Sequence, residues 1–201
     1  MSWIDVNWKQ NRPSDTSIAR LWDSVTVTAE AETLPAVDDY LAELRRININ
    51  GGAFIARFHI VGNRDFNWFA TRNRWDDIAF FSRLFSHPVF ASALPEVATD
   101  VSTAELAEFE WSTPLTLDGE LARTLVMGGA YEKFAGTHRE AKAFGERVAD
   151  ALFGDRFSDV LVFRCDKPWS SWFFDIAWDA TTVLIDKRRQ IVTVLVSTDT
   201  D

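Results

Sequence analysis

The chain has 201 residues, of which 47% are hydrophobic and 25% charged, and these values are ordinary for one globular domain, expected over residues 1–201. They exclude intrinsically disordered and low-complexity proteins. The net charge of −9 disfavours nonspecific binding to nucleic acid or to anionic membrane surfaces, because like charges repel.

The first half of the chain is predicted to be mainly helical. Residues 34–47 place their apolar side chains on one face and carry a proline in the first turn, which predicts a helix. Residues 53–61 are rich in β-branched and aromatic side chains and are predicted to form a strand. Residues 66–72 are expected to pair with that strand as a hairpin, before a helix over 75–84.

The middle of the chain is acidic and predicted to be helical. Residues 96–120 contain seven acids and no lysine or arginine. A capping box is expected over 102–105, and a helix over 117–127. The clearest helix spans 137–153, where Thr137 and Glu140 form a capping box at its start.

The last quarter of the chain changes to strand patterns. Strands are expected over 159–165, 171–179, 181–186 and 190–197. Adjacent strands after a mostly helical part indicate an α+β fold rather than alternating βαβ units. We therefore predict helices in the N-terminal three quarters and an antiparallel β-meander over about 159–197.

The single cysteine and the absence of targeting signals predict a cytoplasmic protein. Cys165 has no partner for an internal disulfide, and it lies in a strand pattern typical of inert packing. The chain starts without a basic region followed by an apolar stretch, and no apolar run approaches the ~20 residues that cross a bilayer.

Two acids in the predicted strand 171–179 are the candidate catalytic residues. Alternation places an aromatic face on one side and Asp175 and Asp179 on the other. Such a pair serves as general acid and base or binds a divalent cation, and Asp199 is a candidate to join it. The alternative is a solvated strand face, with Asp179 starting a turn.

Aromatic side chains form the second candidate site. The chain has nine tryptophans, and Trp169 and Trp172 flank an apparent turn after Pro168. Exposed tryptophans beside polar groups anchor ligands or partner proteins. The alternative is that these rings belong to the core, as most aromatic residues do.

Familiar catalytic and cofactor motifs are absent. The chain lacks glycine-rich nucleotide loops, nucleophile elbows and the HExxH zinc motif, so no cofactor is evident unless the acids hold a divalent cation. A zinc site would need all three histidines, His59, His87 and His138, at spacings that no known zinc motif has.

Three functional hypotheses follow from these patterns. The first is a non-enzymatic interaction protein, regulator- or inhibitor-like, that docks on a basic partner. The second is a carboxylate- or metal-dependent hydrolase that uses Asp175 and Asp179. The third is a small-molecule binder with an aromatic pocket around Trp169 and Trp172. Neither a nucleic-acid nor a membrane partner is expected.

Overall fold

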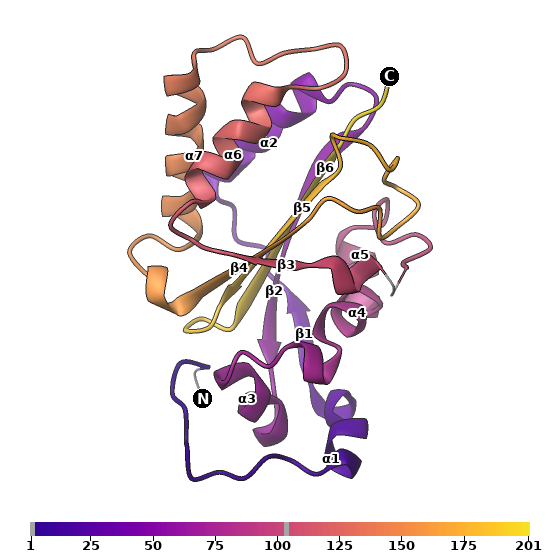
Figure 1. The fold of residues 1–201 in the computed structure, drawn as a ribbon, viewed down its shortest axis with the longest axis vertical. Helices are drawn as coiled ribbons and strands as arrows, with labels where there is room; N and C mark the ends of the chain where they lie inside the picture. Colours follow the sequence, from indigo (N-terminus) through magenta and orange to yellow (C-terminus); the bar gives the residue numbers. More distant parts are fainter. Residues whose placement is uncertain (1–2, 103–104) are drawn as a thin grey trace.

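The structure is a computed structural model and describes residues 3–102 and 105–201. Its framework is a six-stranded antiparallel sheet with the strand order β1-β2-β6-β5-β4-β3 (Figure 1). The strands are β1 (Thr26–Ala29), β2 (Gly52–Val61), β3 (Glu110–Ser112), β4 (Val160–Cys165), β5 (Ala180–Asp186) and β6 (Ile191–Thr198).

Seven α-helices lie in the described residues, all of them before the C-terminal strands β4, β5 and β6. They are α1 (Asp15–Ala19), α2 (Pro35–Ile47), α3 (Arg64–Thr71), α4 (Phe80–Phe85), α5 (Pro88–Ala93), α6 (Leu117–Met127) and α7 (His138–Leu152). Short 3-10 helices lie at η1 (Leu21–Ser24), η2 (Asp76–Ile78), η3 (Glu105–Glu108) and η4 (Phe157–Asp159).

One face of the sheet is covered by α2, α6 and α7, which Figure 1 shows grouped together. Each helix turns an apolar stripe toward the sheet, as its 3.6-residue period predicts. The stripe of α2 is made by Val37, Tyr40, Leu41, Leu44 and Ile47. The helix α7 begins at the capping box of Thr137 and Glu140, as expected.

The other face is covered by α3, α4, α5 and the loop after β4, and its core is aromatic. Phe85 stacks on Phe90, with ring centroids 4.7 Å apart, and Trp169 packs against both. Because helices or loops cover both faces, inner strands are buried along both sides. All eight residues of β6 are buried for this reason.

The predicted α+β class is confirmed, and so are the elements around α2, β2, α6, α7, β4, β5 and β6. The meander is only partly correct. Strands β4, β5 and β6 are consecutive neighbours, but β6 also pairs with β2, so the early strands β1 and β2 belong to the same sheet. The capping box expected over 102–105 includes residues 103–104, which lie outside the described residues.

The hairpin predicted at 66–72 is wrong, because residues 64–71 form α3 and residue 72 caps its end. The side chain of Asn63 accepts a hydrogen bond from the amide of Phe66 at 2.8 Å and caps the helix. Phe66, Phe69 and Ala70 then share one buried face at helical spacing. The aromatic content suggested a strand, but the cap and this spacing favour a helix.

The strand predicted at 171–179 is also wrong. Residues 171–179 form turns and bends, and Asp175 adopts a φ of 59°, which a strand does not contain. The alternation of aromatic and polar residues therefore does not correspond to two faces of a sheet.

No helix in residues 3–102 and 105–201 is long and apolar enough to cross a bilayer.

Candidate functional site

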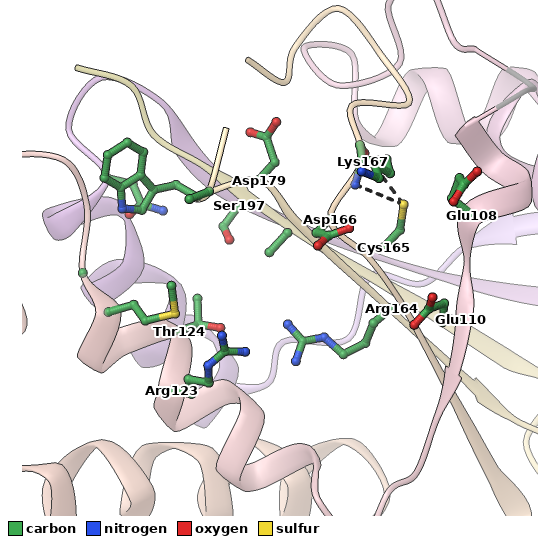
Figure 2. Close-up of a pocket in the computed structure, with 16 residues that line it drawn as sticks. Glu108, Glu110, Arg123, Thr124, Arg164, Cys165, Asp166, Lys167, Asp179 and Ser197 are labelled. Carbon is green, nitrogen blue, oxygen red and sulfur yellow. Dashed lines mark hydrogen bonds between the residues drawn. The ribbon is translucent and has the colours of Figure 1, made fainter. Parts of the chain in front are cut away.

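A polar pocket of about 380 Å³ lies where α6 meets the ends of β4, β5 and β6 (Figure 2). Its volume is within the range of small-molecule sites. Helix α6 contributes Arg123 and Thr124, and β4 contributes Arg164 and Cys165. The chain after β4 adds Asp166 and further lining residues.

Two arginines define the centre of this pocket. Figure 2 shows the guanidinium groups of Arg123 and Arg164 pointing toward one another across it. Arg164 forms an ion pair with Glu120 on α6, with Nη1 3.1 Å from Oε2. Arg123 is exposed and makes neither a hydrogen bond nor an ion pair with any residue that the structure describes. The pocket therefore presents one held and one unengaged guanidinium group.

Acidic side chains line another part of the same pocket. Glu108, Glu110 and Asp166 are exposed, whereas Asp179 is buried. Figure 2 shows the carboxylate of Asp179 pointing away from the arginines. The pocket is thus mixed in charge, and its exposed acids would repel a ligand with many negative charges.

The carboxylate of Asp179 holds the preceding loop to the sheet. It accepts a hydrogen bond from the hydroxyl of Thr198 on β6. Its two oxygens also accept from the amides of Phe174 and Ile176, at 3.4 and 3.3 Å. Asp175 is exposed in that loop. The structure therefore does not place Asp175 and Asp179 on one strand face, and three donors already engage Asp179.

Asp199 connects two other loops. Its Oδ1 accepts from the amide of Asn50 at 2.9 Å, and its Oδ2 accepts from the amide of Ala130 at 2.7 Å. The side chain is fully buried by these contacts. Within the described ranges, no group of three or more histidines, cysteines and acids is arranged to hold a metal ion.

The two candidate tryptophans lie in the core or against it. Trp169 is fully buried, and its indole N–H donates to the hydroxyl of Thr181 at 2.9 Å. Trp172 is half-buried and packs edge-on against Phe54, with centroids 5.5 Å apart. These contacts match the packing alternative that the sequence left open.

Cys165 lines the pocket, but its thiol is weakly reactive. Its sulfur accepts a hydrogen bond from the amide of Lys167 at 3.4 Å. Burial raises the pKa of the thiol above its usual value. Because the thiolate is the nucleophilic form, the thiol is a weak nucleophile at neutral pH.

Sequence reasoning missed the two arginines. A signal for Arg164 existed, because it shares a strand face with Val160 and Val162, which pack against the helices. A charge on a core-facing strand position indicates a partner or a ligand. Arg123 gave no comparable signal, since an arginine on an amphipathic helix is ordinary.

Comparisons with known protein families, with curated proteins and with solved structures found no match for this chain.

Proposed function

We propose that this protein is a non-enzymatic binding protein that holds the anionic group of a small polar molecule between Arg123 and Arg164. The unengaged guanidinium of Arg123, aimed at that of Arg164, supports the proposal most directly. Arginine binds carboxylate and phosphate groups through parallel N–H donors, which gives both affinity and orientation. The ion pair with Glu120 holds Arg164 in position for this contact.

The exposed acids of the pocket restrict the class of ligand. Glu108, Glu110 and Asp166 favour a molecule with one anionic group and a neutral or cationic remainder. Amino acids and simple carboxylates or phosphate monoesters satisfy this condition. Nucleic acid does not, because its backbone would face these acids as well as the net charge of −9.

Calorimetric titration with amino acids, simple carboxylates and phosphate monoesters tests the proposal. We expect saturable binding by at least one class, and its identity distinguishes a carboxylate from a phosphate group. Arg123→Gln should weaken that binding about tenfold or more, as loss of a charge-assisted contact predicts. Arg139→Gln, at an exposed site on α7, is the matched control and should leave affinity unchanged. Equal affinities in the two variants would contradict the proposal.

A second candidate function is docking on a basic protein, which the edge strand β3 favours. Trp111 on this strand is 54% exposed, and the exposed acids Glu108 and Glu110 lie beside it. An exposed aromatic ring beside acids suits a lysine- or arginine-rich segment. Binding of a fluorescent arginine-rich peptide should weaken from ~50 to ~300 mM salt and on Trp111→Ala. Binding that changes neither with salt nor on Trp111→Ala would contradict this second function.

The hypothesis of a carboxylate-dependent hydrolase stays a prediction. The contacts of Asp175 and Asp179 do not support it. Asp179 is engaged by the loop amides and by Thr198, and Asp175 is exposed on a turn. A general base needs an accessible oxygen within reach of its substrate.

A further inference from the structure

A second charged cluster lies at the other end of β5 and β6 from the pocket. We call it the Arg57 cluster; it contains Arg57 on β2, Asp186 at the end of β5, and Glu32, Arg156 and Arg189 from neighbouring segments. The registers place Arg57 opposite Thr193 and Asp186 opposite Ile191. The cluster is therefore far along the strands from Arg123 and Arg164, and it is independent of the function proposed above.

The acids of the cluster are fully engaged. Asp186 accepts from Nε of Arg156 at 3.1 Å and from the amide of Arg189 at 2.9 Å. Glu32 accepts from Nη1 of Arg57 at 2.9 Å, and Nη2 of Arg189 lies 3.5 Å from the same oxygen. The hydrogen bond and charge of Arg57 lower the pKa of Glu32, which keeps that carboxylate ionised.

One donor of the cluster has no partner. The side chain of Arg57 is only 6% exposed, and its Nε–H is buried without a hydrogen-bond acceptor. A buried charged donor left unsatisfied is costly, so native proteins nearly always supply an acceptor. Arg57 lines a cavity of about 10 Å³, which is room for a single small particle.

The charges show which particle suits this cavity. Arg57, Arg156 and Arg189 carry three positive charges, whereas Glu32 and Asp186 carry two negative ones, so one positive charge remains uncompensated. The cavity wall also contains Asp186 and Thr193, together with the apolar side chains Leu152, Phe153, Val160, Leu184 and Ile191. Because buried charges are normally paired, an anion suits this cluster better than a neutral water molecule does.

We propose that the cavity beside Arg57 is a halide site that binds one chloride ion through the Nε–H of Arg57. A monatomic anion completes the hydrogen bonds of that arginine and balances the charge of the cluster. Carboxylates, phosphate and sulfate are too large for a cavity of about 10 Å³. Chloride binding therefore ties β2 to the β5–β6 turn, where Arg57 and Arg189 lie.

Thermal unfolding at constant ionic strength tests the site. Sodium gluconate is replaced stepwise by sodium chloride, so that only the anion changes. We expect a saturable rise in Tm of about 3–5 °C when chloride reaches ten times its Kd. Sodium bromide should act likewise, whereas fluoride, which is strongly hydrated, should show no saturation. Identical curves in chloride and gluconate would overturn the proposal.

Two variants separate the site from general salt effects. Arg57→Met removes the donor and keeps most of the side-chain volume, and it should abolish the chloride-dependent rise in Tm. Arg46→Met breaks a surface pair with Glu43 and should keep the full rise. If both variants kept the chloride-dependent rise in Tm, the assignment of the site to Arg57 would be wrong.

A crystal of the unaltered protein grown in bromide provides a test that does not depend on any variant folding. An anomalous peak within hydrogen-bonding distance of Nε of Arg57 is the expected result. A water molecule at that position, without anomalous signal, would overturn the proposal.

Discussion

Thr198 on β6 donates its hydroxyl hydrogen to the carboxylate of Asp179, the residue directly before β5. The same carboxylate accepts from the amides of Phe174 and Ile176. One buried side chain thus holds the loop 171–179 against the sheet. That loop contributes Ala177 and Trp178 to the polar pocket, so its position shapes the pocket wall.

Asp179→Ala should lower the free energy of unfolding by about 2–3 kcal/mol, because it removes the acceptor of one buried and two partly buried hydrogen bonds. Denaturant titration followed by tryptophan fluorescence measures the change. Asp175→Asn is the control, since Asp175 is exposed and asparagine tolerates its φ of 59°. The control should stay within about 0.5 kcal/mol of the unaltered protein. Equal stabilities of the two variants would argue against the bracing role of Asp179.

Asp199→Ala should also destabilise the fold by about 2–3 kcal/mol, because the amides of Asn50 and Ala130 lose their acceptor. Asp201→Ala, at an exposed position, should have little effect. Amide hydrogen exchange measures the local consequence. Protection should fall at Asn50 and Ala130 in the first variant, and unchanged protection there would refute the account.

Cys165 should react slowly with alkylating reagents at pH 7.5. Its burial and raised pKa keep the thiol protonated, and only the thiolate attacks. We expect modification at least about 100-fold slower than in the same protein unfolded in guanidinium. Mass spectrometry of the labelled protein measures both rates. Comparable rates in the folded and unfolded protein would show that the thiol is accessible and activated.

The start of α7 predicts a contribution to acid sensitivity. Hydrogen bonds from the amide and hydroxyl of Thr137 lower the pKa of Glu140. A carboxyl with a lowered folded pKa stabilises the protein above its unfolded pKa of about 4.5, and this stabilisation is lost as pH falls through the folded value.

Glu140→Gln should therefore flatten the fall of Tm with decreasing pH below about 4.5. Thr137→Ala should lower Tm at pH 7 by about 2–4 °C through loss of the cap. Scanning calorimetry between pH 3 and 7 follows both effects. A Glu140→Gln profile that matches the unaltered protein throughout would contradict the assignment.

Local signals predicted the elements whose patterns agree with their packing. The helices α2 and α7 have apolar periods that match their buried faces, and α7 also carries its capping box. The strand predicted at 171–179 was wrong because alternation of aromatic and polar residues alone does not distinguish a strand from a loop. The deciding contact, from Thr198 to Asp179, joins residues 19 positions apart and is visible only in three dimensions.

The candidate site was less predictable than the fold, since it depends on side chains from separate elements. Arg123 and Arg164 lie 41 positions apart in the sequence and converge only in the fold, where α6 lies beside the end of β4. Asp199 was predicted as a candidate to join Asp175 and Asp179, and its carboxylate accepts hydrogen bonds from the backbone amides of Asn50 and Ala130. Sequence patterns identified chemically notable residues without indicating which of them face a cavity.

The place of β6 between β2 and β5 bears on how the protein folds. The pair β1–β2 and the group β3–β4–β5 have no strand pairing with each other except through residues 191–198. During synthesis, the edges of β2 and β5 that pair with β6 therefore stay unpaired until residues 191–198 leave the ribosome. Such edges recruit other chains, so a chain stalled before residue 191 would be a substrate for chaperones rather than a partly working protein.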